Sequence, residues 1–482
     1  MKLNLYNKLV NYNKTDIYPM HMPGHKRNDQ IISGLDPYSI DITEIDGFDN
    51  LFHASGIIKV AMERAASLYG SEHSNFLVGG SSAGILSGVS ACTNKGDKVL
   101  VSRNCHKSVY NAIYLNELRP VYIYPQIDKG YGIDCGIKPE SIEEMLIKHD
   151  DIKLIIITSP TYEGVISDIE GISHIAHKYK IPVFVDEAHG AHLGFHDFFP
   201  KNSIGLGADI VVHSLHKTLP SFTQTGLLHV NSDLVDYERV KEFLSIYQST
   251  SPSYILMAGI DRCIDLLSKE ANKLFENYSK TLKGFFNRME SLKNIKVINK
   301  ESSDSNFFDF DPSKIVASVR NTNISGTDLY KLLLDRYRIQ VEMASKDYII
   351  AMTSICDTEL GFSRLASALE EIDKGLKVKK KENKDKDIEF SNLYLNSMHM
   401  DTEIVMTSFE AKSSKLERIP FKSSKGRVTG EYIYLYPPGI PILVPGERIT
   451  KRHIKYLQMC KELGLSIQGP EDYQMQYIKV VV

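Results

Sequence analysis

Two apolar runs, each followed by polar residues, constrain the fold of this chain more than any other feature. The first run, Val183 to Val185, leads directly into Asp186, and the second, Ala208 to Ser214, lies just before Lys217. A short, continuously apolar run is typical of a strand buried on both faces of a parallel sheet. Asp186 and Lys217 are 31 positions apart, which suffices for a helical or loop crossover between neighbouring strands. The sequence therefore predicts that both side chains meet at one sheet edge.

The region from about residue 55 to 230 alternates amphipathic and apolar segments in a βαβ rhythm. Helices are expected at 57–68, 108–118 and 141–148, and strands at 76–78, 98–101, 121–124 and 154–158. This alternation predicts an α/β fold in which helices cover both faces of a doubly wound, mostly parallel sheet.

The pattern of predicted elements changes after about residue 260. A long helical stretch at 260–289 is followed by a strand at 315–319 and a helix at 326–337. A dense charge run at 377–387 is typical of a solvated linker, with a binding tail as the less favoured alternative. We expect four parts: an N-terminal segment and large domain (1–290), a small domain (291–376), the linker (377–387) and a C-terminal domain (388–482).

Composition excludes several classes of protein. The 482 residues are 42% hydrophobic and 24% charged, which is ordinary for a soluble globular protein. A net charge of −3 gives no reason to expect nucleic acid or an anionic membrane as a partner. No stretch approaches the about 20 apolar residues of a membrane span. The six cysteines are scattered without a CxxC pair, so neither a metal site nor a disulfide framework is indicated, and a reducing cytoplasm is the simplest location.

A buried acid beside a lysine at a sheet edge is the arrangement that pyridoxal phosphate (PLP) needs. The lysine forms a Schiff base with the cofactor, and the acid keeps the pyridine nitrogen protonated so that the ring accepts electrons. Taken singly, Lys217 could be an ordinary exposed lysine and Asp186 a strand-end cap. The strand, the acid and the flanking hydroxyls together favour PLP. The sequence predicts Lys217 and Asp186 as catalytic residues.

A segment from Leu77 to Gly84 joins a predicted strand to a helix and could bind the cofactor phosphate. Its small residues let backbone amides approach an anion, and the hydroxyls of Ser81 and Ser82, with Ala83 after them, lie at the helix N-terminus. Glycine-serine turns are common, so this segment is weak evidence alone. Ser214 is a second candidate phosphate donor.

Several histidines lie beside these elements. His106 follows the strand ending near Val101 and could stack on the pyridine ring, although a surface or capping histidine is the plainer alternative. Ala188 and His189 follow Asp186 and could contact the cofactor, with structural roles equally open for His189. His216 precedes Lys217 and could contact the phosphate or tune the Schiff base, or only pack.

Ordered motifs extend over nearly the whole chain. They are Met22 to Lys26, Asp41 to Ile45, Asp49 to Leu51, the block at His106, Ser159 to Gly164, Asp186 to His189, Ser214 to Thr218, Gln248 to Tyr254, Tyr436 to Pro441 and Pro445 to Glu447. In this order they resemble the PLP-dependent ornithine/lysine/arginine decarboxylase family in its short form, and most of all its bacterial arginine-specific members. Asp46 and Ala54 stand where prolines are expected, and Gly79 where asparagine is more usual. These departures bear on the subgroup and not on cofactor binding.

The resemblance implies the PLP fold type I of aspartate aminotransferase: a PLP-binding large domain, a small α+β domain and a C-terminal α+β domain. It implies decarboxylation of a basic amino acid, with arginine to agmatine first, lysine to cadaverine second and ornithine to putrescine third, in polyamine biosynthesis. It also implies a homodimer or larger homo-oligomer, with the segment 248–254 near the cofactor across the interface.

Two other classes stay open on sequence alone. An aminotransferase would share Lys217 and Asp186 but would need an arginine to grip the α-carboxylate, for which Arg364 is the candidate. A non-catalytic regulator of the same fold is the second alternative, against which the intact Lys217, Asp186 and His106 argue. Either Lys217 or His106 could return the proton to Cα. The acids available to a basic substrate side chain are Glu44, Asp46, Asp49 and Glu163.

Overall fold

The computed structural model describes residues 8, 11–28, 30–31, 36–128, 130–299, 307–378, 402–435 and 439–482. Tyr436 to Pro438, most of the expected charged linker and residues 388–401 of the expected C-terminal domain lie outside the described residues. The four-part division of the chain stays a prediction.

A seven-stranded sheet forms the centre of the molecule. Its order is β2 (His73–Leu77), β11 (Gly226–Val230), β10 (Ile210–His213), β9 (Val183–Asp186), β7 (Ile152–Thr158), β3 (Lys98–Ser102) and β4 (Arg119–Ile123). The pairs from β10 to β4 are parallel, whereas β11 is antiparallel to both of its neighbours. The α/β fold with a mostly parallel sheet is therefore confirmed.

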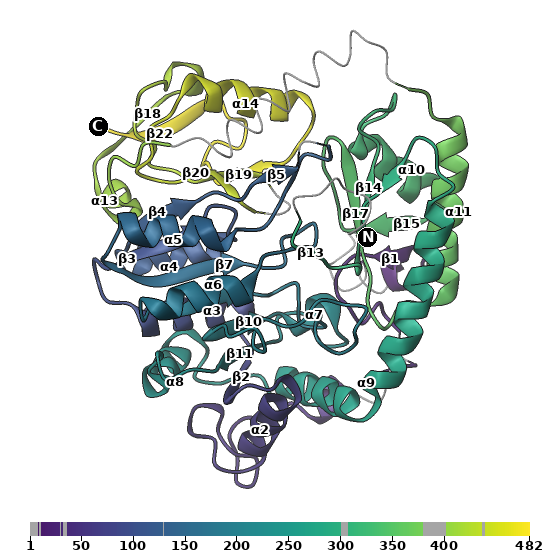
Figure 1. The fold of residues 1–482 in the computed structure, drawn as a ribbon, viewed down its shortest axis with the longest axis horizontal. Coiled ribbons are helices and arrows are strands. Elements are labelled where there is room, and N and C mark those ends of the chain that lie inside the picture. The colour runs from purple at the N-terminus through teal and green to yellow at the C-terminus, as the bar shows by residue number, and fades with distance from the viewer. Residues whose placement is uncertain are drawn as a thin grey trace.

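Helices cover both faces of this sheet (Figure 1). One apolar cluster joins it to α3 (Gly80–Cys92), α4 (Lys107–Leu115) and α8 (Tyr237–Tyr247). The other joins it to α2 (Ile57–Tyr69), α5 (Pro139–Lys148), α6 (Ile169–Lys178) and α9 (Tyr254–Met289). Neighbouring residues of one strand enter different clusters, as Ile155 and Ile156 do. Burial on both faces explains why these strands are continuously apolar.

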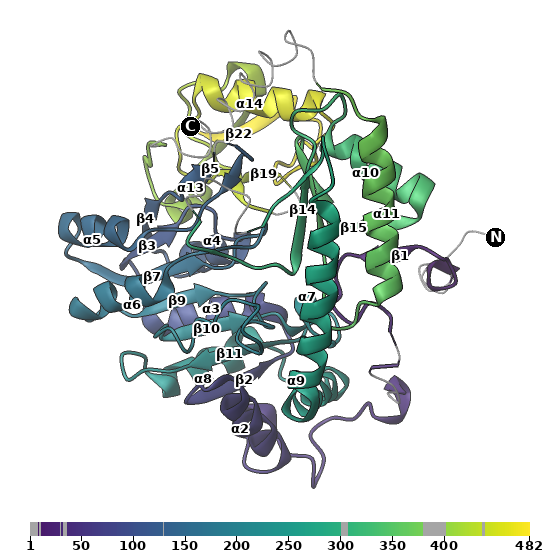
Figure 2. The ribbon, with the colours of Figure 1, turned by 45° about the vertical axis from the view of Figure 1, so that its right-hand side comes forward.

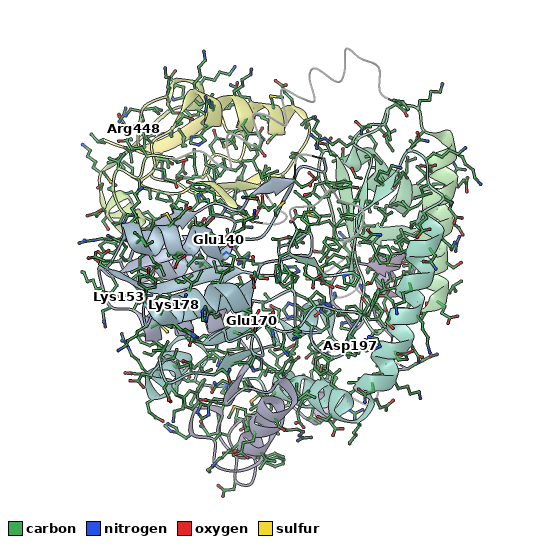
Figure 3. All side chains as sticks on the ribbon, viewed as in Figure 1. Glu140, Lys153, Glu170, Lys178, Asp197 and Arg448 are labelled. Atoms are coloured by element: carbon green, nitrogen blue, oxygen red, sulfur yellow. The ribbon has the colours of Figure 1, made fainter. Side chains whose placement is uncertain are left out.

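The ends of the outer helices follow ordinary capping chemistry. The Asp168 carboxylate accepts a hydrogen bond from Gly171 N at 2.9 Å and caps α6. Figure 3 labels exposed Glu140 and Glu170 in the first turns of α5 and α6, and exposed Lys178 in the last turn of α6. Acids at the start and a base at the end of a helix complement its dipole.

Helix α3 lies unusually close to the sheet because two glycines face it. A Cβ on Gly84 would lie 2.7 Å from Leu77 Cδ1, and one on Gly88 would lie 2.4 Å from Phe184 Cε2. No side chain larger than hydrogen fits these positions without movement. The close approach fixes the N-terminus of α3 beside the carboxyl ends of the strands.

Helix α9 continues from the large sheet to a second, antiparallel sheet, along which it packs on α11 (Glu359–Gly375) (Figure 2). This sheet has the order β12 (Lys296–Val297), β14 (Lys314–Ser318), β17 (Tyr348–Met352) and β16 (Met343–Ala344), with α10 (Gly326–Tyr337) beside it. The N-terminal strand β1 (Tyr18–Met20) pairs in parallel with β15 (Ile339–Val341). The start of the chain is thereby attached to this second region.

The C-terminal region, residues 402–482, has its own apolar cluster, which includes Ile433, Tyr456 and Ile478. It contains α13 (Ser408–Ser413), α14 (Lys451–Glu462), the pair β18 (Leu416–Pro420) with β22 (Tyr477–Val481), and the sheet β20 (Pro441–Leu443), β19 (Ile433–Leu435) and β21 (Ile467–Gln468). In Figure 1 it is coloured yellow and lies over the end of the central sheet that carries β4.

Most expected elements appear with small differences at their ends. The helix expected to reach residue 118 stops at Leu115, because Glu117 adopts a left-handed φ of 52° that a helix does not continue through. The strand expected at 76–78 begins earlier, at His73, and ends at Leu77. Within the described part of the chain, no helix combines the length and the apolar character that crossing a membrane requires.

Candidate active site

The carboxyl edge of the central sheet brings Asp186 and Lys217 together, as the strand pattern predicts. Asp186 ends β9, its neighbour β10 runs parallel to it, and Lys217 lies in the short helix α7 (Leu215–Thr218) that follows β10. The connection between the two strands is a loop without a helix. Both side chains line a cavity of about 310 Å³.

Nearly all of the predicted site residues line this cavity. They are Ser81, Ser82, His106, Asp186, Ala188, His189, Ser214, His216 and Lys217. Ala83 lies just behind them in the first turn of α3, where it is buried and does not line the cavity. The cavity also has lining residues that sequence reasoning did not select: Met22, Gly80, Asn104, Asp134, Thr158, Thr161, Tyr162, Glu342 and Ile440.

Lys217 is half-buried, and its amine lies beside a histidine. Its Nζ lies 3.0 Å from His189 Nε2. Burial lowers the pKa of Lys217, against the opposing attraction of Asp186. Burial and the neighbouring Lys217 also hold the pKa of His189 well below its usual range. A neutral amine is the nucleophilic form of lysine, so this environment suits covalent attachment of a carbonyl compound.

Asp186 is a buried carboxyl with an exposed fraction of 3%. Its Oδ1 accepts a hydrogen bond from Ala188 N at 3.2 Å. Burial raises the pKa of Asp186, and the positive charge of Lys217 works in the opposite direction. A protonated ring nitrogen placed here would supply the counter-charge that a buried carboxylate requires.

His106 both caps a helix and lines the cavity. Its Nδ1 accepts a hydrogen bond from Ser108 N at 3.3 Å at the start of α4 and lies 2.8 Å from Ser108 Oγ. Burial, with smaller contributions from Lys217 and Lys107, lowers the pKa of His106 to about 3. The ring is therefore neutral and carries its proton on Nε2, which suits a flat aromatic contact.

The start of α3 is suited to bind an anion, because Gly79 caps the helix without a side-chain hydrogen bond. The Gly80 N–H is already engaged, since it donates to the Gln224 carbonyl at 2.9 Å. Gln248 fixes the loop before α3 from α8, because its Oε1 accepts from Val78 N at 2.8 Å and from Gly79 N at 3.3 Å. These contacts lie within one chain.

Two further polar groups lie opposite that loop. Ser214 Oγ is buried and has no hydrogen-bond partner among the described residues. His216 Nδ1 lies 2.9 Å from the Thr225 carbonyl, and burial lowers the pKa of His216 to about 4. A buried hydroxyl without a partner, a helix start without a side-chain cap, a lysine and a buried acid line one cavity, and this set of groups fits PLP.

The cavity also contains three acids. Asp134 ends the hairpin β5 (Ile127–Asp128) and β6 (Ile133–Asp134), and its Oδ1 is buried with no partner in the described residues. Burial, then the charge of Glu163, raises the pKa of Asp134 to about 7. Glu163 accepts from Tyr348 Oη at 2.8 Å, and burial raises its pKa. Glu342 follows β15 and accepts from Met22 N and Tyr162 Oη, both at 2.8 Å.

Of the four acids that the sequence makes available to a basic side chain, Glu163 alone is among the described lining residues of the cavity. Asp49 instead caps α2: although its partial desolvation opposes ionisation, hydrogen bonds from Ser55 N and Gly56 N hold its pKa at about 2. Glu44 and Asp46 lie outside the lining as well. Arg364 donates to the carbonyls of Tyr337 and Asp16 in the second region and does not reach the cavity, whose lining includes no arginine.

Sequence reasoning missed Asn104, Asp134 and Glu342. Glu342 had a weaker signal, because it directly follows the short strand 339–341, in which Ile339 and Val341 are buried. Asn104 lies two residues before His106 and could have been included with it. Asp134 ends a two-residue strand inside a loop-rich segment, for which no periodic pattern exists.

Comparisons with known proteins bear on the family and the fold of this chain. The model of the Orn/Lys/Arg decarboxylase major domain matches residues 4–342, and that of the family's C-terminal domain matches residues 389–472. The chain is 34% identical to an arginine decarboxylase of Bacillus anthracis over 99% of this chain and 97% of that protein. The structure is similar to that of the Francisella novicida lysine decarboxylase LdcF, with a TM-score of 0.77 and 20% identity over 99% of this chain and 83% of that one.

A more distant likeness concerns the fold alone. Ureidoglycine-glyoxylate aminotransferase from Bacillus subtilis has a TM-score of 0.56 and 14% identity over 74% of this chain and 93% of that one. The fold is therefore that of the PLP fold-type-I enzymes.

Proposed function

This chain belongs to the Orn/Lys/Arg decarboxylase family and decarboxylates a basic amino acid, and we propose that its substrate is arginine, which it converts to agmatine. The α-carboxylate leaves as carbon dioxide, and Cα gains one proton in its place. The observation that carries the proposal is the cavity that combines Lys217 and Asp186 with three acids, and whose described lining residues include no arginine.

The family and the fold neighbours imply PLP as the cofactor. PLP, when bound, supplies an electron sink for the pair of electrons left on Cα as carbon dioxide departs. In this proposal Lys217 Nζ attaches the cofactor covalently, and Asp186 holds the proton on the ring nitrogen. Its phosphate is bound by the residues around the start of α3 and β10: Ser81, Ser82, Ser214 and His216.

His106 and Lys217 have further roles on the reacting side. The neutral imidazole of His106 offers a flat face without adding a charge that would compete with the ring nitrogen. Lys217 Nζ lies 3.0 Å from His189 Nε2 and would be available for proton transfer whenever it does not hold the cofactor. An amine of lowered pKa next to an imidazole can hold and return the proton that Cα gains. We assign this proton to Lys217.

The three acids support a cationic substrate side chain. A guanidinium is planar and carries five N–H donors, so it can be shared between carboxylates that lie on different sides of it. The charge of Glu163 contributes to the raised pKa of Asp134, and a bound cation beside these carboxyl groups would favour their ionised forms. An ammonium group is more strongly hydrated and has only three donors, which makes lysine and ornithine weaker candidates.

The lack of an arginine in the described lining supports decarboxylation over transamination. An aminotransferase needs a cation that holds the α-carboxylate throughout the reaction, and Arg364 is engaged elsewhere. A decarboxylase must instead leave that carboxylate free to depart.

The direct test incubates the PLP-loaded protein separately with arginine, lysine and ornithine. Carbon dioxide, the product amine and any keto acid are measured together. Agmatine with an equal amount of carbon dioxide is the expected result. Cadaverine or putrescine as the main product would overturn the choice of arginine, and a keto acid would overturn decarboxylation. If none of the three amino acids reacts while the visible absorbance of bound PLP is intact, the substrate proposal fails and only the cofactor proposal stands.

The assembly and location belong to the same proposal. We infer a cytoplasmic homodimer that feeds polyamine synthesis, supported by apolar side chains that are more than half exposed: Ile57 and Val60 on α2 and Ile246 on α8. Scattered free cysteines suit a reducing compartment. Light scattering coupled to gel filtration tests the dimer, and a monomer at micromolar concentration would contradict it.

A further inference from the structure

Arg103 connects the active-site loop to the C-terminal region. It follows β3 directly and stands three residues before His106. Its Nη1 donates to the Pro441 carbonyl at 2.7 Å, and its Nη2 donates to the Ile442 carbonyl at 3.3 Å. Nη2 also lies 3.3 Å from a carboxylate oxygen of Glu447. One guanidinium thus holds three groups of a region that follows it by more than 330 residues.

Both partners of this ion pair are buried, with side-chain exposures of 5% for Arg103 and 2% for Glu447. Glu447 is held on its own side, because it accepts from Val444 N at 2.8 Å. Arg103 Nη1 also donates to Tyr110 Oη at 2.7 Å, and Tyr110 Oη in turn donates to the Arg103 carbonyl at 2.6 Å. The side chain and the backbone of Arg103 are therefore fixed together.

The two segments that Arg103 joins both face the cavity. On its own loop, Asn104 and His106 are lining residues; on the other side, Ile440 is a lining residue next to the bonded Pro441. Displacing the guanidinium would release the wall that Ile440 forms and the loop that carries His106. An interaction outside the cavity is thus connected to two of its walls.

We propose that Arg103 is a positioning residue, which sets His106 and Ile440 relative to each other by tying the active-site loop to the C-terminal region through Glu447 and the carbonyls of Pro441 and Ile442. The C-terminal region is then part of the machinery for turnover rather than an appended unit. This inference rests on the proposed function only where agmatine formation is measured. The second measurement, the environment of bound PLP, does not depend on the identity of the substrate.

The chain contains a matched control for this ion pair. Arg448, next to Glu447 in sequence, forms an exposed pair with Glu403, with side-chain exposures of 38% and 61% (Figure 3 labels Arg448). The Arg448 Nε to Glu403 distance is 2.7 Å, so the geometry is at least as good as in the buried pair. An exposed pair contributes little to stability and touches no cavity wall. A positioning role should therefore be found in one pair and not in the other.

The experiment compares two double variants and one single variant. Arg103→Met with Glu447→Gln removes the buried pair without leaving an unpaired charge, which alone would be strongly destabilising. Arg448→Met with Glu403→Gln is the exposed control. Arg103→Lys keeps the charge but loses the planar fork that reaches several acceptors. Each protein is loaded with PLP, and visible circular dichroism, PLP affinity, melting temperature, kcat and KM are measured.

We expect the buried double variant to lower kcat about tenfold to a hundredfold, since a displacement of about 1 Å in a catalytic group can cost that much. The KM for arginine should change less than kcat, and the visible dichroism of bound PLP should fall. Arg103→Lys should lie between this variant and the wild type. The exposed double variant should stay within about twofold of the wild type in every readout.

Normal kcat and normal dichroism in the buried double variant would overturn the inference. A second result would also overturn it: the variant is folded, and its kcat per mole of bound PLP equals that of the wild type. The loss of activity would then come only from weaker PLP binding, which marks a structural role alone. If the wild type binds PLP but makes no agmatine, the proposed substrate fails while the dichroism comparison still decides the inference. Should the double variant not fold, Arg103→Lys provides the same comparison.

Discussion

The residues that line the cavity form two sets that are built in different ways: a cofactor end, with Asp186 and Lys217, and an acidic end, with Asp134 and Glu342. At the cofactor end, Asp186 and Lys217 follow adjacent parallel strands of a single sheet. At the acidic end, Asp134 comes from a hairpin, Glu342 from the second region, and Ile440 from the C-terminal region. Parallel strands must deliver their ends to one edge, so the first set is a consequence of the sheet. The second set depends on how three regions pack together.

This difference separates the residues that carry out the reaction from those that select the substrate. The cofactor end can stay the same while the packing of the other regions changes which side chain is accepted. Substitutions at the two ends should therefore differ in kind: those at the cofactor end should act on kcat, and those at the acidic end on KM and substrate choice.

The largest effect is expected at the covalent anchor. Lys217→Ala should lower agmatine formation at least about a thousandfold with PLP supplied, because the attachment point and the proposed proton donor are both lost. The measurement is product amine under saturating arginine, with exposed Lys178→Ala as the control. Activity within tenfold of the wild type would remove Lys217 from its proposed role.

Asp186→Asn tests the charge at the same end. We expect kcat to fall about a hundredfold or more while part of the PLP stays bound, since a preorganised electrostatic stabiliser is lost but the covalent anchor remains. The visible absorbance spectrum measures the bound cofactor, and the rate of agmatine formation at saturating arginine gives kcat. Near-normal turnover would refute this role for Asp186.

At the acidic end, Glu342→Gln should act on binding. Loss of one charged partner of the substrate cation is expected to raise the KM for arginine about tenfold or more, with kcat within about threefold. Glu170→Gln, an exposed acid on α6, is the control. An unchanged KM together with a large loss of kcat would place Glu342 in the catalytic steps and break the comparison.

Asp134→Asn should change the pH dependence of binding and of stability. The pKa of Asp134 is raised to about 7, so its carboxyl is neutral below that pH and attracts a cation only above it. The kcat/KM for arginine should therefore rise between pH 6 and pH 8 in the wild type and rise less in the variant.

Stability changes with pH in the opposite direction. The folded protein keeps the Asp134 proton up to about pH 7, whereas the unfolded chain loses it above about pH 4. Folding thus becomes less favourable as the pH rises through this window, and Asp134→Asn should raise the melting temperature at pH 8 but not at pH 4. Parallel pH profiles in the two proteins would contradict the raised pKa.

The smallest effect is expected at Ile440. Ile440→Ala removes part of one cavity wall without removing a charge or a hydrogen bond, so we expect a change of about twofold to threefold in KM, measured with arginine and lysine in parallel. A change in the ratio of the KM values for arginine and lysine would sharpen the comparison, because it would show that the C-terminal region contributes to specificity directly.

Sequence patterns predicted the cofactor end well because its residues follow long, periodic elements. The apolar runs before Asp186 and Lys217 are buried on both faces, and such runs are visible in any sequence. His106 was found for the same reason, since it follows β3, although its capping of α4 was expected only as an alternative. Motif order then carried the assignment from the cofactor to the family.

The acidic end could not be predicted in this way. Asp49 and Asp134 are both aspartates in loop-rich segments, yet one caps a helix and the other lines the cavity. No local pattern distinguishes them, because the difference arises from which distant segment packs against each. Arg364 likewise looked available in sequence and is engaged by carbonyls of its own region.

The sequence by itself thus determined the central sheet, the position of Asp186 and Lys217 at its edge, and the family. The tertiary structure decided which acids reach the cavity and that Arg103 bonds the C-terminal region to the active-site loop. The physical reason is the distance along the chain over which each feature is determined. Apolar periodicity reflects burial within one element. A contact such as Arg103 to Glu447 joins residues that only the packing of separate regions brings together.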